Sequence, residues 1–162
     1  MSRIDPARPD VAVSVELRAS PEVAWQAVAD PRRTSSWSPE VVAVSADESM
    51  TGPLPVGTRF SGSKRHHIFR WTTRCVVVES TPGESFAFDV SYLGLDVSRW
   101  RYTVAPVDGG ARVDEQWWDT RGGLMKLIGL VGTGVADRRT HNGRTMRETL
   151  DALATDLGRT EP

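Results

Sequence analysis

Glu115 carries the carboxyl group in this sequence that is best placed to do chemistry. It lies between Val113 and Trp117 in the segment RVDEQWW, whose alternation predicts a strand with all three side chains on one apolar face. A carboxyl group enclosed by apolar side chains has a raised pKa and can act as an acid or base near neutrality. Two interpretations stay open: Glu115 contacts or acts on a ligand, or it pairs with an inward Arg139 or a helix-end group.

Large amphipathic side chains are predicted to share the face of Glu115. Alternation places this set inward in three neighbouring segments: Trp71 and Thr73, Phe88 and Tyr92, and Trp100 and Tyr102. A plain core favours Leu, Ile, Val and Phe, because buried Trp and Tyr need partners for their polar atoms. Small-molecule sites have large apolar walls with few polar groups, so the pattern favours a ligand cavity. The alternative is a tightly packed core whose Tyr and Trp polar atoms bond to one another.

The histidines and the cysteine do not indicate metal or nucleophile chemistry. His66 and His67 are adjacent in a predicted strand, where successive side chains point to opposite faces, and His141 is distant in sequence. Cys75, the only cysteine, is predicted to be a buried structural thiol with no histidine beside it. We therefore expect no metal and no cofactor.

Turn and cap signals divide the chain into the elements that must position these residues. Alternating segments predict seven strands, at residues 11–18, 41–46, 58–69, 70–80, 85–94, 97–106 and 111–120. Between the first two strands, Ser20 and Pro21 begin a short helix that Pro31 ends, and a second short helical turn follows. The last six strands read as an antiparallel meander, whose apolar face needs a helical cover.

A long C-terminal helix is predicted to provide that cover. One apolar face carries Met146, Leu150, Leu153 and Leu157, and the helix is expected to start near residues 133–135. Extending this face backwards brings Gly143 (or Asn142), Arg139, Val135 and Gly132 toward the sheet. Glycine costs roughly 1 kcal/mol in a helix relative to alanine, and room for a ligand, a kink or a flexible entrance would explain it. Residues 122–134 form either a short helix or a loop.

Composition limits the classes of protein and partner. The 162 residues carry 20 basic and 21 acidic side chains, and residues 11–158 are expected to form a single domain after a loose arm at 1–10. The arginines at 70, 74, 99 and 101 are predicted to form an outward solvated face without the aromatic side chains that nucleic acid requires, so no nucleic acid is expected. The most apolar run is too short to span a bilayer and no signal peptide is recognisable, which favours a cytoplasmic protein without stable membrane insertion.

Several segments together resemble the START/Bet v 1-like (SRPBCC) superfamily, in its polyketide cyclase/dehydrase-like branch. They are VSVELRASPEVAWQAVADP, WSPE, GPLPVGTRF, WTTRCVVVESTPGESFAF and WRYTVAP followed by GGARVDEQW, within residues 11–120. The resemblance implies an α+β helix-grip fold: a seven-stranded curved antiparallel sheet wrapped around the C-terminal helix, with two short helices after the first strand. It also implies a deep hydrophobic cavity between sheet and helix. It carries over no catalytic set, because this fold hosts several activities.

The function expected from the sequence is therefore the binding of a small hydrophobic or aromatic molecule, polyketide- or lipid-like, by a monomer or homodimer. The candidate ligand-binding residues are Trp71, Thr73, Phe88, Tyr92, Trp100, Tyr102, Glu115, Trp117, Gly132, Val135, Arg139 and Gly143. The first alternative is a polyketide cyclase/dehydrase-type enzyme that orients its substrate and uses one acid/base, for which Glu115 is the best candidate. The second is an interaction module, such as a chaperone regulator or an antitoxin-like partner, for which a closed, dry core is expected.

Overall fold

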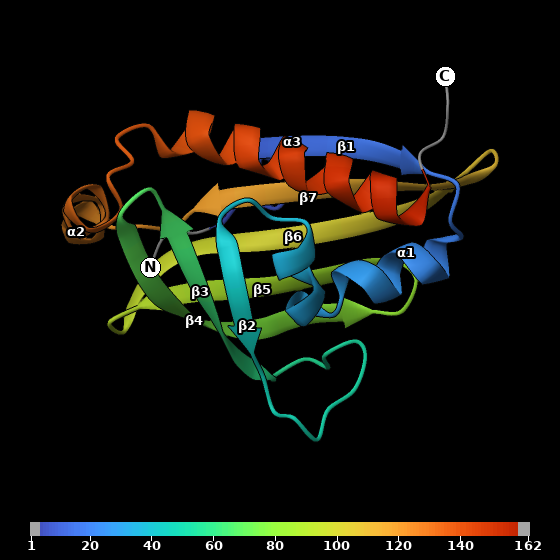
Figure 1. Cartoon of the computed structure of the whole chain (residues 1–162), viewed down its shortest axis with the longest axis horizontal. Coiled ribbons are helices and arrows are strands. Elements are labelled where there is room, and N and C mark those ends of the chain that lie inside the picture. Colours follow the sequence, from blue (N-terminus) through green and yellow to red (C-terminus); the bar gives the residue numbers. More distant parts are fainter. Residues whose placement is uncertain (1–3, 159–162) are drawn as a thin grey trace.

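The computed structural model describes residues 4–158 and has one curved antiparallel sheet (Figure 1). Its strands are β1 (Val11–Leu17), β2 (Val41–Ser45), β3 (Arg59–His66), β4 (Phe69–Thr81), β5 (Ser85–Tyr92), β6 (Leu95–Val107) and β7 (Gly110–Asp119). They pair in the order β1-β7-β6-β5-β4-β3-β2, so the first strand joins the last and the other neighbours follow the chain. The predicted seven-stranded α+β helix-grip fold is confirmed.

The two short helices after the first strand are also confirmed. They are α1 (Pro21–Val28) and the 3₁₀ helix η1 (Pro31–Ser36). The hydroxyl of Ser20 accepts a hydrogen bond from the Val23 N–H at 3.3 Å and caps α1, and the carboxylate of Asp30 caps η1 in the same way. Proline stands at the first position of each helix, where its missing N–H costs no hydrogen bond.

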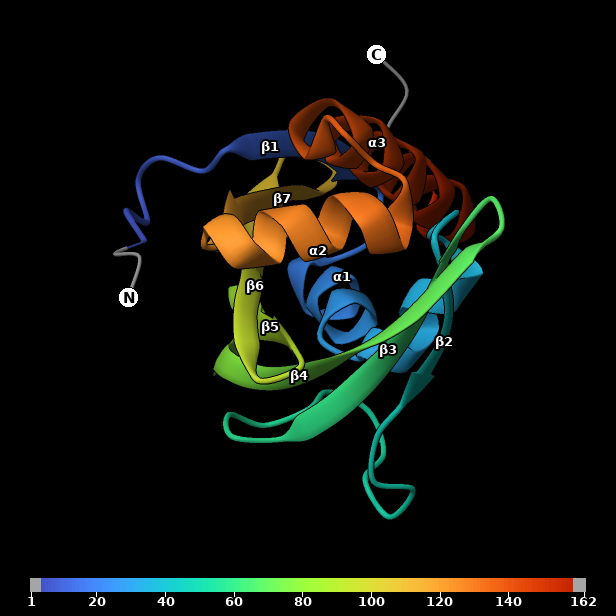
Figure 2. The same cartoon turned by 90° about the vertical axis from the view of Figure 1, so that its left-hand side faces the viewer.

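The sheet bends because three of its strand pairs change register. Irregularities lie between β2 and β3, between β4 and β5, and between β5 and β6. Figure 2 shows the sheet curling from β1 to β2, with α2 (Gly123–Thr133) lying across one end and α3 (Arg138–Leu157) beside β1. The concave face therefore has helical cover from α2 and α3 at this end of the molecule.

The long helix α3 buries the predicted face. Met146, Leu150 and Leu153 are 1%, 2% and 1% exposed, and Leu157 is half-buried. The predicted start near residues 133–135 is wrong: α2 ends at Thr133, its C-cap Gly134 adopts a left-handed φ of +66°, and α3 begins at Arg138 after its Asp137 cap. Of the two alternatives for residues 122–134, the helix is correct. Within residues 4–158, no helix has the length and apolar character needed to cross a membrane.

The first described residues contact β7. The backbone N–H of Asp10 donates to the carbonyl of Trp117 at 2.9 Å, and its carboxylate accepts from the N–H of Asp119 at 2.9 Å. The indole N–H of Trp118 donates to the carbonyl of Asp5 at 2.8 Å. Residues 5–10 of the predicted arm thus cover the outer side of the last strand.

Substitution of Gly134 tests whether the contact with Phe69 holds the end of α2 in place. A Cβ atom at this position would lie 2.7 Å from Cε2 of Phe69, and the backbone is left-handed. Gly134→Ala should lower the free energy of unfolding by about 1–2 kcal/mol for the left-handed backbone, plus the cost of moving Phe69. Gly94→Ala is the matched control, since its φ is +78° and its Cβ would meet open space. Urea denaturation should show a larger loss for Gly134→Ala than for Gly94→Ala; equal losses would mean that Phe69 does not hold α2.

Candidate functional site

A cavity of about 250 Å³ lies between the concave face of the sheet and the helices α2 and α3. We call it the outer chamber. Its walls comprise Lys64, Arg70, Trp71, Thr73, Val90, Tyr92, Val97, Ser98, Trp100, Trp117, Arg121, Met125, Ile128, Gly129, Gly132, Thr133, Arg138 and Asn142. Three tryptophans from β4, β6 and β7 supply much of the apolar wall, and five residues of α2 line the cavity as well.

A smaller chamber of about 60 Å³, which we call the inner chamber, adjoins the outer one between the sheet, η1 and α3. Four residues belong to the walls of both: Lys64, Thr73, Val90 and Trp100. The inner walls also include Phe88, Tyr102 and Glu115 from the sheet, and Met146 from α3. Because the chambers share these residues, a ligand in the outer chamber could contact side chains that also line the inner one.

Nine of the twelve candidate residues line these chambers. The outer walls contain Trp71, Thr73, Tyr92, Trp100, Trp117 and Gly132, and the inner walls add Phe88, Tyr102 and Glu115. Strand alternation placed the eight sheet residues together, and Gly132 reaches the cavity from α2. A Cβ atom at Gly132 would have no neighbour within 4 Å, so this glycine borders open space.

The other three candidates lie outside both chambers. The expected inward orientation of Arg139 is wrong: its side chain is 69% exposed and pairs with Asp10 at 2.8 Å. Gly143 faces β1, where its Cβ would lie 3.6 Å from Val11, and Val135 is buried in the link between α2 and α3. Val135 lies before α3 begins, and within α3 the buried face passes through His141, Asn142 and Thr145 rather than through Gly143, so Arg139 lies outside it. Arg138 and Asn142 line the outer chamber instead.

Glu115 is bonded to a tyrosine rather than to an arginine. The hydroxyl of Tyr102 donates to Oε1 of Glu115 at 2.8 Å, and Glu115 is 2% exposed. Its Oε2 atom has no hydrogen-bond partner among the described residues. Burial raises the pKa of Glu115 to about 8, against the lowering by the Tyr102 hydrogen bond and the charge of Lys64. The arrangement provides one buried, protonated carboxyl group at neutral pH.

Lys64 lines both chambers but is not among the twelve candidate residues predicted from the sequence. Its Nζ atom lies 5.4 Å from the ring centroid of Trp100, a cation–π distance. The signal was present in the alternation of β3, because Phe60 and Gly62 are buried and Lys64 continues the same face.

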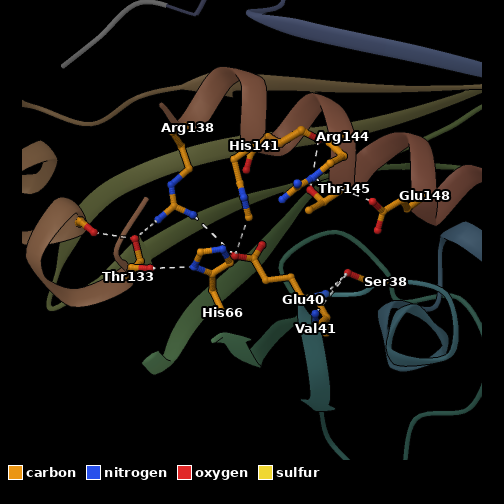
Figure 3. Close-up of polar contacts among 12 residues, drawn as sticks. Ser38, Glu40, Val41, His66, Thr133, Arg138, His141, Arg144, Thr145 and Glu148 are labelled. Carbon is orange, nitrogen blue, oxygen red and sulfur yellow. Dashed lines mark hydrogen bonds and ion pairs between the residues drawn. The ribbon is translucent and has the colours of Figure 1, made fainter. Parts of the chain in front are cut away.

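A buried polar cluster joins the start of α3 to β2 and β3 (Figure 3). Oε1 of Glu40, a 6% exposed residue, lies 3.5 Å from Nε2 of His141 and 3.7 Å from Nη1 of Arg138. Burial alone would raise the pKa of Glu40, but the contact with His141 and the charges of Lys64 and Arg138 lower it to about 2. The carboxylate is thus ionised and locally compensated.

The three histidines lie closer together than expected. The rings of His66 and His67 are 4.3 Å apart and those of His66 and His141 are 4.8 Å apart. The expectation of opposite faces fails because His67 leaves the strand and adopts a φ of +52° in the turn before β4. Nδ1 of His66 contacts the carbonyl of Thr133 at 3.2 Å and so connects β3 to α2. In the described part of the chain, no three His, Cys, Asp or Glu residues are grouped to hold a metal ion.

Cys75 is a buried thiol, and two of the four outward arginines have carboxylate partners. Burial raises the pKa of the Cys75 thiol to about 11, which disfavours the nucleophilic thiolate. On the other face of the sheet, Arg99 pairs with Asp89 at 2.6 Å and Arg101 pairs with Glu79 at 2.9 Å. Carboxylates therefore compensate the arginines at 99 and 101.

Solved structures of the same fold cover nearly the whole chain, while no curated protein matches it. Protein CV1439 from Chromobacterium violaceum is 18% identical, with a TM-score of 0.64 over 93% of this chain and 98% of that one. The polyketide-cyclase-like protein Cgl2372 from Corynebacterium glutamicum is 24% identical, with a TM-score of 0.61 over 95% and 96%. The di-domain ARO/CYC StfQ of the steffimycin biosynthetic pathway is 18% identical, with a TM-score of 0.62 over 91% of this chain and 51% of that one.

The sequence matches a known protein family, and the fold of the chain is consistent with that match. Residues 8–158 match the family described as polyketide cyclase / dehydrase and lipid transport. This range includes all seven strands, both chambers and α3. The chain therefore belongs to the polyketide cyclase / dehydrase and lipid transport family, within the START/Bet v 1-like superfamily.

Proposed function

We propose that this protein binds a small hydrophobic or amphipathic molecule, polyketide- or lipid-like, in the outer and inner chambers. The observation that carries the proposal is the cavity of about 250 Å³ walled by Trp71, Trp100 and Trp117. Large aromatic walls with a few inward polar groups are the usual composition of a small-molecule site. Each Å² of apolar ligand surface buried there contributes roughly 25 cal/mol to binding.

The polar groups of the two chambers would orient the ligand. Lys64 and Asn142 reach the outer walls, and Glu115 with Tyr102 lies at the inner walls. These four groups stand on strands or on α3, which keeps their geometry fixed. The match of this chain to the family described as polyketide cyclase / dehydrase and lipid transport is consistent with a ligand of this apolar kind.

A neutral fluorescent probe tests the proposal without knowledge of the natural ligand. N-phenyl-1-naphthylamine should bind the native protein with one-site saturation and enhanced emission. Native mass spectrometry of protein purified from its own host should in addition show a co-purified small molecule. A native, cooperatively folded protein that binds no probe and carries no small molecule would contradict the proposal and favour the interaction-module alternative.

A second candidate function is a cyclase/dehydrase-type enzyme, and the Tyr102–Glu115 pair favours it. Oε2 of Glu115 has no partner among the described residues, and the carboxyl group lines the inner chamber. Ring closure of a polyketone requires a proton to leave a methylene carbon and a proton to reach a carbonyl oxygen, which one acid/base can assist once the chain is oriented. StfQ, a structure of the same fold, is an ARO/CYC. Product analysis with a polyketone thioester would distinguish this function: turnover lost in Glu115→Gln supports it, and absence of turnover in wild type contradicts it.

A further inference from the structure

Lys64 brings a positive charge into the cavity without a hydrogen-bonded or ion-paired anion among the described residues. It lines both chambers, and its ammonium group lies 5.4 Å from the ring centroid of Trp100. Within residues 4–158 the structure gives Lys64 no hydrogen bond and no ion pair. A half-buried ammonium group in an apolar wall is costly unless an anion or water compensates it, so this charge calls for a partner from outside the chain.

Two carboxyl groups of the inner walls, Glu40 and Glu115, interact electrostatically with Lys64 but do not bond to it. Glu40 is compensated by Arg138 at 3.7 Å and by His141 at 3.5 Å (Figure 3). Glu115 accepts the hydrogen bond of Tyr102, and burial raises its pKa to about 8, so it is largely uncharged at pH 7. Lys64 therefore has a favourable electrostatic interaction with the ionised Glu40, but its ammonium group forms no hydrogen bond or ion pair with a described carboxylate.

The other charged side chains in the walls of the outer chamber are also positive. Its walls contain the cations of Lys64, Arg70, Arg121 and Arg138, and no aspartate or glutamate. Arg121 is compensated by Asp119 at 2.7 Å and Arg138 by Glu40, which leaves Lys64 and the exposed Arg70. Asn142, 3% exposed on α3, adds a neutral hydrogen-bonding amide to the same wall. A positive field inside an apolar wall selects amphipathic molecules that carry a negative charge.

We propose that the ligand of this cavity is an amphipathic anion: an apolar or aromatic body with one acidic oxygen group that binds Lys64. This inference rests on the proposed function and specifies its ligand class. The body would lie against Trp71, Trp100 and Trp117, while the oxygen group accepts a charge-assisted hydrogen bond from the ammonium. A carboxylate, an enolate and a sulfonate share the required chemistry, and neutral hydrocarbons lack it.

Two probes with the same ring system separate charge recognition from apolar binding. 1-Anilinonaphthalene-8-sulfonate is anionic, and N-phenyl-1-naphthylamine is its neutral counterpart without the sulfonate. Lys64→Met retains an unbranched apolar stem and removes the charge. It should raise the Kd of the anionic probe at least about tenfold, because a partly desolvated ion pair is lost, and should change the Kd of the neutral probe by less than about twofold. Lys64→Arg keeps the charge and should restore most of the affinity for the anionic probe.

Lys126→Met is the matched control, since Lys126 is the only other lysine and lies exposed on α2 outside the outer chamber. It should leave both Kd values unchanged. If Lys64→Met does not fold, Lys64→Gln serves as the second charge-removing variant, with thermal denaturation confirming the fold. Equal effects of Lys64 replacement on both probes, or no effect on the anionic one, would overturn the anion proposal while leaving apolar binding intact. Binding of neither probe by wild type would instead overturn the proposed function itself.

Discussion

Gly132→Leu is expected to weaken the binding of N-phenyl-1-naphthylamine about 100-fold while leaving the protein folded. Gly132 lies on α2 in the outer wall, and a Cβ atom there would meet open space. A leucine adds four carbon atoms to that space and displaces ligand groups of similar size. At about 0.8 kcal/mol for each methylene that can no longer be buried, the loss is about 3 kcal/mol, or about 100-fold in Kd. Fluorescence titration measures the Kd directly.

Stability distinguishes a filled cavity from a disrupted core. Gly132 lies in the last turn of α2, so leucine there should keep or slightly raise the melting temperature, because it removes part of a helix penalty that reaches about 1 kcal/mol in a helix interior. Gly123→Leu, on the same helix but outside the outer chamber, is the control and should not alter the Kd. A large loss of stability in Gly132→Leu would indicate overpacking. Unchanged probe binding would mean that the probe does not occupy the outer chamber.

Glu115→Gln is expected to stabilise the protein at pH 8 and to have little effect at pH 5. The pKa of Glu115 is raised by burial to about 8 from an ordinary value of 4.5, so between these values the native state holds a proton that the unfolded chain has lost. The free energy of unfolding then decreases as the pH rises, by at most about 1.4 kcal/mol per pH unit. Between pH 5 and pH 8 the accumulated loss for wild type is about 3–4 kcal/mol. Glutamine stays neutral and should not show this loss.

Urea denaturation at several pH values measures this difference. The Oε1 atom of the new amide can still accept the hydrogen bond of Tyr102, so the variant retains the local geometry. Glu16→Gln, which removes an exposed carboxyl group from β1, is the control and should leave the pH dependence of wild type unchanged. A Glu115→Gln variant that is less stable than wild type at pH 8 would show that the carboxylate is ionised and needed in the native state.

The sheet and its inward face could be predicted from the sequence because strand side chains alternate strictly. Trp71 and Thr73, and Trp100 and Tyr102, stand two residues apart in strands that run without interruption past the cavity. The two residues of each pair therefore lie on the same side of the sheet, independently of how the neighbouring strands pair. Glu115 followed by the same rule, although its partner Tyr102 comes from the adjacent strand, directly opposite in the register.

The helical side of the site was harder to predict because helix phase depends on where a helix starts. A single left-handed residue, Gly134, separates α2 from α3, and three further residues pass before Arg138 begins the second helix. The break leaves Val135 in the link, and within α3 the buried face passes through Asn142 rather than Gly143, so Arg139 lies at the surface and pairs with Asp10. The break is set by tertiary contacts such as the approach of Phe69 to Gly134, which local spacing does not reveal.

The cluster of Glu40, Arg138 and His141 could not be predicted from sequence patterns. Its members come from the start of β2 and the start of α3, about a hundred residues apart, and meet only when the sheet closes over the helix (Figure 3). Lys64 was a different case, since the alternation of β3 already pointed it inward beside Phe60 and Gly62. A lysine on an otherwise apolar face is a usable signal for a site that recognises charge.

Intermolecular nuclear Overhauser effects between bound N-phenyl-1-naphthylamine and the protein test most directly whether this cavity is the ligand site. The ring protons of the probe should show contacts with the indole protons of Trp100 and Trp117 and with the methyl group of Thr73, all in the outer walls. Contacts confined to exposed side chains on the outer side of α2, such as Leu127 and Val131, would contradict a cavity site and place binding on the surface.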